Sequence, residues 1–403
     1  MTTERLTVLD LFCGAGGLAL GLHRAGFVPV LAIDNNAAAL ETYNNYFGSG
    51  AVALDLSQSP ALPACDVIVG GPPCQGFSSA GMRRNGDRRN SLVAAFAETI
   101  VAIKPKAFIF ENVEGFLTAE NGDRVRDLLG PLLDAGYRIH LRKINAANYG
   151  VPQHRKRVIG IGGLGWNPTF PTPTHTAFGA PGALLHSKYL PLTPTVMDAI
   201  GDLPIAETQS PGVPAGHYFR PLEGIDLVRA QALEPGMKMR DLAEDLQHES
   251  YRRRAFRRVK DGTPSEKRGG APAGLRRLRP NEPSKSITGG ARSEFLHPTA
   301  DRNLTIRECA RLQTFPDDFV FAGNASEQVQ LIGNAVPPLL AEVIAKTLAL
   351  DLRTKKCECD EGALLSFVPT HSEGSSPALQ HTTFMVNETF HRFITIEELP
   401  LWR

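Results

Sequence analysis

Short apolar runs alternate with segments of helical composition through the first 163 residues of the chain. The runs consist largely of Val, Ile, Leu and Phe, and most of them end at a glycine or a polar residue. Continuous apolar strands that alternate with helices are typical of a parallel sheet covered on both faces. We expect about seven strands, at Thr7–Phe12, Val28–Asp34, Ala51–Leu56, Asp66–Gly70, Ala107–Val113, Tyr137–Ile144 and Arg157–Gly162.

The composition and the hydrophobic period of the chain change after Gly163. Residues 164–295 are rich in Pro, Gly, Thr and Ser and show no sustained period, which indicates a smaller, loop-rich domain. Helical patterning returns in residues 296–352, which we expect to complete the first domain, at 1–163. Residues 353–403 show no clear period and are interpreted as an appendage of unknown role. The predicted fold is α/β, with a Rossmann-like, doubly wound, mostly parallel seven-stranded sheet and a smaller second domain.

Composition narrows the class of protein. The chain has 403 residues, of which 42% are hydrophobic and 21% charged, a balance that favours a globular enzyme over a disordered or fibrous protein. No apolar run approaches the length of a membrane span, and the N-terminus lacks the apolar core of a signal peptide. We therefore expect a cytoplasmic protein whose six scattered cysteines are free thiols.

Charge is unevenly distributed along the chain. The net charge of +1 does not by itself indicate a nucleic-acid partner. Residues 251–280, however, contain 11 Lys and Arg against 2 Asp and Glu. A run of this kind is usually a solvated loop, but it is also suited to the phosphates of a nucleic acid.

The first candidate site is a glycine-rich turn after the first expected strand. Gly14-x-Gly16-x-x-Ala19 is followed by Asp34, at the end of the next strand and 20 residues beyond Gly14. This is the dinucleotide-binding pattern, in which glycines let the backbone approach a ligand and the acid binds ribose hydroxyls. The pattern predicts an adenosine-containing cofactor and leaves NAD open. Phe12, directly before the turn, is a candidate to stack on adenine.

A second candidate site follows the fourth expected strand. Cys74 comes after two prolines that fix the backbone, at the end of an apolar run where parallel sheets bind ligands. We interpret it as a nucleophile, which needs an electropositive surrounding to form the thiolate. Cys13, Cys65 and Cys309 are interpreted instead as small buried hydrophobic residues.

Polar residues at the ends of two further strands are expected beside Cys74. Glu111 ends the next strand along the chain. Gln153, Arg155 and Arg157 precede the seventh strand, and two-residue alternation puts all three on one face. A carboxylate and basic residues at one edge of the sheet would surround the thiol.

Six motifs of the chain resemble, in their sequence, order and spacing, those of the C5-cytosine DNA methyltransferase family, of bacterial restriction-modification type. The resemblance covers nearly all of residues 5–352 and displaces NAD with S-adenosylmethionine. Where the family usually carries Glu on the second strand, this chain has Asp34, a shorter arm toward the ribose. The motifs are Asp10-Leu-Phe-Cys-Gly-Ala-Gly-Gly17, Gly71-Pro-Pro-Cys-Gln-Gly-Phe-Ser78, Glu111-Asn-Val113, Gln153-His-Arg-Lys-Arg157, Arg307-Glu-Cys-Ala-Arg-Leu-Gln-Thr-Phe-Pro316 and Gly333-Asn-Ala-Val-Pro-Pro338.

The resemblance implies a role for each matched residue. Cys74 would add to C6 of cytosine, Glu111 would hold N3 and supply its proton, Arg155 would hold the O2 edge, and Arg157 would buttress the site. The expected cofactor pocket comprises Phe12, Gly14, Ala15, Gly17, Asp34, Asn35, Asp55, Leu56, Pro73, Leu92, Asn334 and Val336.

The resemblance also implies a duplex DNA partner, because the target base must be flipped out of the helix. The basic segment lies in the family's target-recognition region. We expect a monomer without an obligate protein partner, associated with the bacterial nucleoid, and leave open whether a cognate restriction endonuclease exists. The expected DNA-binding residues are Gln153, Arg252, Arg253, Arg254, Arg257, Arg258, Arg276 and Arg277.

Other interpretations make different predictions. The tRNA-methylating branch of the family typically carries Cys-Phe-Thr in its recognition region, and this tripeptide does not occur here. A nicotinamide-dependent oxidoreductase would leave Cys74 and Glu111 unused, and a catalytically dead DNA-binding relative would not need them. Cys357-x-Cys359 with His371 is a weak metal-binding pattern, and an ordinary tail is the favoured interpretation.

Overall fold

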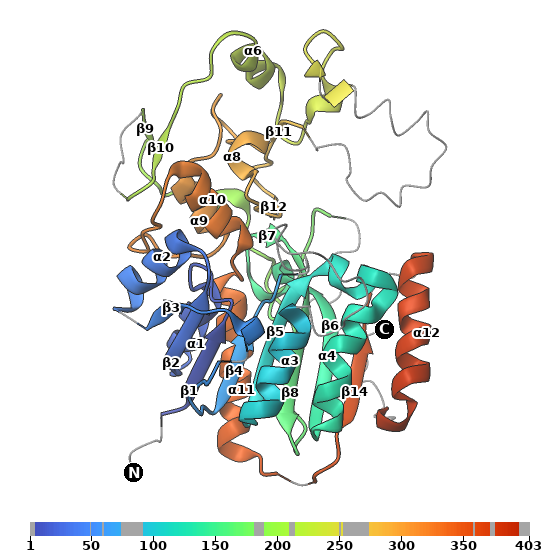
Figure 1. Cartoon of the computed structure of the whole chain (residues 1–403). Coiled ribbons are helices and arrows are strands. Elements are labelled where there is room, and N and C mark those ends of the chain that lie inside the picture. The colour runs from blue at the N-terminus through green and yellow to red at the C-terminus, as the bar shows by residue number, and fades with distance from the viewer. Residues whose placement is uncertain are drawn as a thin grey trace.

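The structure of the protein, a computed structural model, places a large sheet-containing lobe below a smaller lobe (Figure 1). The residues that it describes are 5–48, 50–58, 60–73, 92–180, 189–208, 214–249, 251–252, 274–357, 359–370 and 375–394.

The large lobe is built on one eight-stranded sheet, with strand order β14-β6-β8-β5-β4-β1-β2-β3. All neighbouring strands are parallel except β8, which is antiparallel to both β5 and β6. The predicted mostly parallel Rossmann-like sheet is confirmed, but with one more strand than expected. The strands are β1 (Thr7–Leu11), β2 (Val28–Asp34), β3 (Ala51–Ala53), β4 (Val67–Gly70), β5 (Ala107–Val113), β6 (Tyr137–Asn145), β8 (Lys156–Leu164) and β14 (Ala363–Val368).

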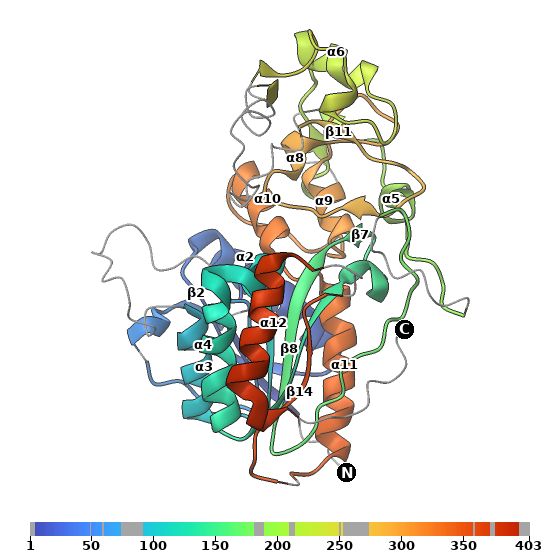
Figure 2. The ribbon, with the colours of Figure 1, turned by 90° about the vertical axis from the view of Figure 1, so that its right-hand side faces the viewer.

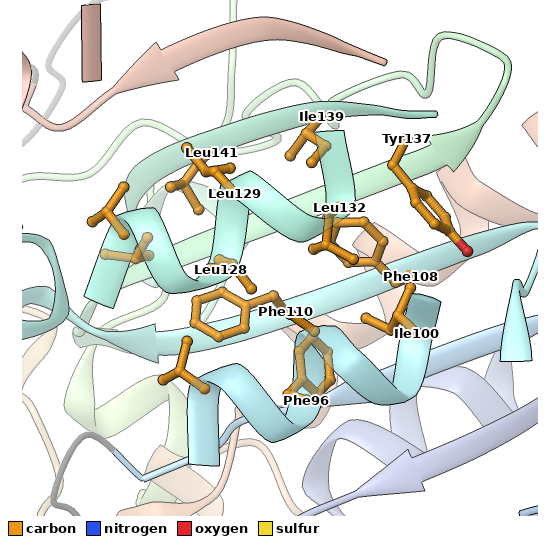
Figure 3. Packing of buried hydrophobic residues seen from close by; sticks show 14 of the residues in the cluster. Phe96, Ile100, Phe108, Phe110, Leu128, Leu129, Leu132, Tyr137, Ile139 and Leu141 are labelled. Carbon is orange, nitrogen blue, oxygen red and sulfur yellow. The ribbon is translucent and has the colours of Figure 1, made fainter. Parts of the chain in front are cut away.

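Helices cover both faces of this sheet, which explains why its strands are apolar on both sides. One face packs against α3, α4 and α12, where Phe96 and Leu128 meet Phe110 of β5 (Figure 3). The other face packs against α1 and α11, which approach closely enough that a side chain at Gly21 would collide with Ala341. The helices are α1 (Gly17–Arg24), α2 (Ala37–Phe47), α3 (Leu92–Ile103), α4 (Asp123–Asp134), α11 (Pro338–Thr354) and α12 (Pro377–Phe390).

Within its described residues, the smaller lobe contains only short elements, as its loop-rich sequence predicts. It has a small core of its own, formed by Ala230, Leu233, Met239, Leu242 and Leu296. Three two-stranded ladders pair β9 with β10, β11 with β13, and β12 with β7. The elements are β7 (Gln153–His154), α5 (Val196–Ile200), β9 (Glu207–Thr208), β10 (Tyr218–Phe219), α6 (Gly224–Ala232), β11 (Arg276–Arg277), β12 (Ser284–Lys285), α8 (Ala291–Glu294) and β13 (Phe295–Leu296).

Two helices connect the lobes. α9 (Ile306–Leu312) and α10 (Ala325–Asn334) lie between the sheet and the smaller lobe (Figure 1). Their buried residues share one apolar cluster with Ile287 and Phe295 above and with Ala15 and Leu20 of the large lobe below. The two lobes are therefore joined by packed side chains as well as by the chain itself.

The C-terminal segment corrects the expectation of an appendage. β14 pairs with β6 as the edge strand of the main sheet, and α12 lies beside α4 (Figure 2). Ser366 of β14 contacts two side chains of β6, His140 through Nδ1 at 2.8 Å and Arg142 through Nε at 2.7 Å. The Thr382 hydroxyl of α12 donates to the carbonyl oxygen of Leu117 at 2.8 Å. Residues 363–394 thus complete the large lobe.

None of the helices within the described ranges has both the length and the apolar content to cross a membrane. Nor do these ranges contain a group of three His, Cys, Asp or Glu residues placed to hold a metal ion. Cys357 and Cys359 are free thiols, and His371 lies outside the described residues.

Candidate active site

The glycine-rich turn lies at the carboxyl end of β1 and is held by the acid that ends β2. Phe12, Gly14 and Gly16 all have positive φ angles, of 61°, 54° and 87°. Asp34 Oδ2 accepts a hydrogen bond from the backbone N–H of Gly14 at 2.8 Å. Its Oδ1 accepts from the backbone N–H of Asn35 at 2.8 Å. The carboxylate therefore links the ends of two neighbouring strands and fixes the turn between them.

Two glycines of this turn have different surroundings. A Cβ at Gly14 would meet no atom within 4 Å, so open space lies against the backbone there. A Cβ at Gly17 would collide with the carbonyl oxygen of Val336. Gly17 therefore lets the segment after α10 approach the start of α1. Two residues expected in one pocket, Gly17 and Val336, are in fact neighbours.

The other residues expected in the cofactor pocket occur near the same edge of the sheet. Asp55 and Leu56 follow β3, Pro73 follows β4, and Leu92 begins α3. Leu56 is buried, whereas Asp55, Pro73 and Asn334 are exposed. Because β3, β2, β1 and β4 are adjacent in that order, their carboxyl ends form one continuous rim.

A buried acid, Asp10, lies beneath this rim. Burial, and then the charge of Asp34, hold the pKa of the Asp10 carboxyl well above its usual range. Burial also raises the pKa of Cys65 to about 11, and raises the pKa values of Cys13 and Cys309 further. The three cysteines interpreted as hydrophobic residues are thus poor nucleophiles, and all five described cysteines are free.

Glu111 and Arg157 form an ion pair at the end of β5. The Nε of Arg157 lies 2.8 Å from Oε1 of Glu111, and both side chains are largely buried. The antiparallel pairing of β5 and β8 brings these residues together, with Val113 opposite Arg157. The position of Arg157 on β8 thus brings this arginine, and not Arg155, to the Glu111 carboxylate.

The chain that leads into Cys74 crosses directly over this ion pair. A Cβ at Gly71 would lie 3.0 Å from Oε2 of Glu111, so the backbone passes close to the carboxylate. Asn112 Nδ2 donates to the carbonyl oxygen of Pro72 at 2.8 Å. Cys74 itself lies outside the described residues. Gly71 and Asn112 both stand inside the motifs quoted above, but nothing in their local sequence indicates this positioning.

Arg155 does not occupy the place expected for it. The side chain is fully buried, and its NH1 and NH2 groups donate to the carbonyl oxygens of Ile287, Gly333 and Ala335. Because these donors are directed at the backbone of two other segments, one at Ile287 and one at the end of α10, Arg155 joins the smaller lobe to the large lobe. The expectation that it holds the target base is therefore revised, and Arg157 is the arginine beside Glu111.

Two residues expected to bind DNA are also buried. Gln153 donates to the carbonyl oxygen of Leu312 and accepts from the N–H of Ile287. Arg277 donates from all three guanidinium nitrogens, to four backbone carbonyls and to Asp301. Neither side chain presents a free donor to solvent, so both expectations are corrected to structural roles.

Of the remaining expected DNA-binding residues, the structure describes only Arg252 and Arg276. Arg252 is exposed, 3.7 Å from Glu244. Arg276 is half-buried, with its guanidinium over the ring of Phe295 at 5.8 Å. Arg253, Arg254, Arg257 and Arg258 lie outside the described residues.

Comparison with known proteins places these features in a family. A family model described as C-5 cytosine-specific DNA methylase matches residues 6–349. The Type II methyltransferase M.AgeI of Thalassovita gelatinovora is 32% identical over 424 residues, covering 85% of this chain and 99% of the relative. M1.HphI of Haemophilus parahaemolyticus, also a Type II methyltransferase, is 34% identical, covering 85% and 86%.

A solved structure agrees with these relatives. It is described as a DNA modification methyltransferase encoded within a prophage of E. coli, and it matches with a TM-score of 0.63 and 26% identity. The match covers 86% of this chain and 99% of that one. Since the family match ends at residue 349, β14 and α12 lie beyond it.

Proposed function

The chain belongs to the C-5 cytosine-specific DNA methylase family and is a DNA (cytosine-5) methyltransferase, and from this premise we propose how its residues act. The methyl donor is S-adenosylmethionine, and the target is a cytosine flipped out of a specific duplex sequence. The observation that carries the proposal is the Glu111–Arg157 ion pair under the segment that leads into Cys74. The enzyme serves as the modification half of a restriction-modification system.

The rim of β-strand ends suits an adenosine-containing donor. Open space at Gly14 leaves room for a ligand against the backbone, and acids follow both β2 and β3. When bound, S-adenosylmethionine supplies an electrophilic methyl group on a sulfonium. Phe12 would stack on adenine, Asp34 would bind the ribose, and Asp55 would hold the adenine amino group. Gly14, Ala15 and Gly17 would support the methionine end, and the pocket would be completed by Asn35, Leu56, Pro73, Leu92, Asn334 and Val336.

The reacting carbon, C5 of cytosine, is a poor nucleophile until the ring is activated. The Cys74 thiolate adds to C6, while Glu111 holds the N3 edge and supplies a proton there, so that negative charge does not accumulate on the ring. Arg157 holds the Glu111 carboxyl in place and faces the O2 edge. C5 would then attack the methyl carbon of the sulfonium, and S-adenosylhomocysteine would leave. Loss of the C5 proton to a base, return of the N3 proton to Glu111 and cleavage of the C6–S bond restore the enzyme.

The smaller lobe binds the DNA substrate in this proposal. A base inside a duplex is unreachable, so the enzyme expends a few kcal/mol of unstacking to flip it out. Arg252, Arg253, Arg254, Arg257 and Arg258 contact the DNA backbone or bases, together with Arg276. One chain supplies both catalysis and recognition, so the enzyme acts as a monomer in the bacterial cytoplasm. A restriction endonuclease that cuts the same sequence is its counterpart.

Transfer of labelled methyl groups from S-adenosylmethionine tests the proposal. Wild type, Cys74→Ala and Cys357→Ala are each incubated with mixed duplex DNA and, in parallel, with tRNA. Conversion sequencing then locates the modified cytosines. We expect label at C5 of cytosines within one short DNA motif for wild type and for Cys357→Ala, whose thiol lies in the tail. Cys74→Ala should transfer none but still bind the donor.

Each other outcome has a separate meaning. Label in tRNA alone would assign the chain to the tRNA-methylating branch and sink the DNA proposal. Transfer by Cys74→Ala at the wild-type rate would remove that residue from the mechanism. Loss of donor binding in Cys74→Ala would contradict its assignment to C6 attack.

A further inference from the structure

Basic side chains form a row from the start of β8 into the smaller lobe, and strand pairing sets their order. Lys156 begins β8, one residue before Arg157. β7 pairs with β12 (Figure 1), and in this pairing Lys285 lies opposite His154. Lys156 and Lys285 both lie close enough to His154 to lower its pKa, which burial lowers first. The row therefore starts at the first residue of β8, next to Arg157 along the chain and on the opposite face of the strand.

The row continues on the next ladder of the smaller lobe. Lys238 lies opposite Arg276 in a bridge between their backbones. The side chain of Arg279 packs against Gly236, two residues before Lys238. Together with Lys156 and Lys285, these three side chains define what we call the basic track: Lys156, Lys285, Arg276, Lys238 and Arg279.

Countercharge along the basic track is sparse. Arg279 has Glu282 at 3.4 Å, and Glu294 acts on Arg276 at longer range. Within the described part of the chain, neither Lys156 nor Lys285 has an ion-pair partner. The pKa of Lys285 is lowered, first by burial and then by the charge of Arg276; Glu282 opposes this shift, and Lys238 and Arg279 add smaller contributions that lower the pKa. Like charges held together without partners are stabilised by an external anion.

One side-chain nitrogen of Arg276 also lacks a hydrogen-bond partner in the described ranges. Its Nε is buried and finds no hydrogen-bond partner among the described residues, while its guanidinium lies over Phe295. Arg277, the next residue, is saturated by backbone carbonyls and Asp301. Two consecutive arginines thus differ, one saturated by the lobe around it and the other half-buried with its guanidinium over an aromatic ring.

We propose that the basic track binds the phosphodiester backbone of the DNA that flanks the flipped cytosine. This proposal rests on the proposed function, because it presumes that DNA approaches the Glu111–Arg157 pair. The ligand is the phosphate oxygen, which carries no sequence information, so the track positions the duplex and the choice of sequence lies elsewhere. Anchoring the backbone beside the site holds the DNA while the target base leaves the stack.

The salt dependence of DNA binding by the full-length enzyme tests the track. Affinity is measured between 50 and 200 mM salt for a duplex that contains the methylated motif and for an unrelated duplex. The variants are Lys285→Gln, Lys156→Gln, the double variant, the rescue Lys285→Arg, and the control Lys346→Gln on α11. Lys346 is an exposed lysine of the large lobe that pairs with Glu342.

We expect each lost phosphate contact to reduce the slope of log affinity against log salt by about 0.9. When the salt concentration is raised fourfold, wild-type affinity falls by a certain factor. For each single Gln variant that factor should be about 3.5 times smaller. The double variant should lose two contacts, on both duplexes alike, while Lys285→Arg and Lys346→Gln keep the wild-type slope. Unchanged slopes in the Gln variants, or an effect confined to the specific duplex, would overturn the track. A wild type that binds no duplex would instead overturn the proposed function.

Discussion

Arg157 and Glu111 meet across the antiparallel pair of β8 and β5, with Nε 2.8 Å from Oε1, while Arg155 points to another part of the molecule. Two-residue alternation had placed both arginines on one face. The chain breaks regular strand geometry at Arg155, between β7 and β8, where it leaves the small ladder for the main sheet. Alternation does not carry across such a break, and this separates the roles of the two arginines.

The same substitution at the two arginines should therefore have different effects. Arg157→Lys keeps a positive charge but loses the fixed guanidinium geometry that holds Glu111. We expect single-turnover methyl transfer to fall about 100-fold, while the free energy of unfolding falls by less than for Arg155→Lys, because the positive charge beside Glu111 is kept. Arg155→Lys cannot reach Ile287, Gly333 and Ala335 together, so buried carbonyls lose their donors. It should lower the free energy of unfolding by about 3 kcal/mol.

Urea unfolding and single-turnover kinetics on both variants provide the measurement. Each variant is the control for the other, because the chemical change is identical. If Arg155→Lys is as stable as wild type and only transfers methyl groups more slowly, then Arg155 acts in the chemistry and its role is not structural.

The C-terminal helix should contribute stability to the large lobe. Phe390 is 3% exposed and packs in the apolar cluster with residues of β5 and α4. Phe390→Ala leaves a cavity there, and we expect it to lower the free energy of unfolding by about 3–5 kcal/mol. Phe384, on the same helix, is 64% exposed, so Phe384→Ala should change it by no more than about 0.5 kcal/mol. Equal effects in urea denaturation would mean that α12 does not dock as described.

Local patterning was enough to predict most of the large lobe. The strands that carry Asp34, Glu111 and the segment before Cys74 are continuous apolar runs, and their polar ends meet at one rim because parallel strands share a direction. β14 was missed although residues 363–368 are mostly apolar. A run of six residues fits a strand or a helix, and only the open edge of β6, far away in sequence, decides between them.

The fate of individual basic residues could not be predicted from their type. Arg276 and Arg277 are adjacent in the sequence and both were expected to bind DNA. Which one is buried depends on the ladder of β11 with β13 and on the carbonyls above it. Lys285 was not singled out, because a lone lysine in a loop-rich region carries no local signal. Its significance comes only from its pairing opposite His154.

Acid should destabilise the enzyme through a buried histidine that fastens the tail to the sheet. His140 Nδ1 lies 2.8 Å from Ser366 Oγ, and its Nε2 lies 3.0 Å from the carbonyl oxygen of Pro168. Burial, and then the charge of Arg142, lower the pKa of His140 from 6.5 to about 4. The folded state therefore resists protonation at a pH where the unfolded chain already binds the proton.

The sign of the pH effect follows from that difference. The contribution of His140 to the free energy of unfolding is fully present above pH 6.5 and is lost as the pH falls to about 4, by about 3 kcal/mol in total. Urea denaturation of wild type and His140→Gln across this range should show a shallower decline for the variant. His391→Gln, at the exposed end of α12, should follow wild type. If His140→Gln declines as steeply as wild type, His140 is already protonated in the folded protein and the contact with Ser366 is not the acid-sensitive one.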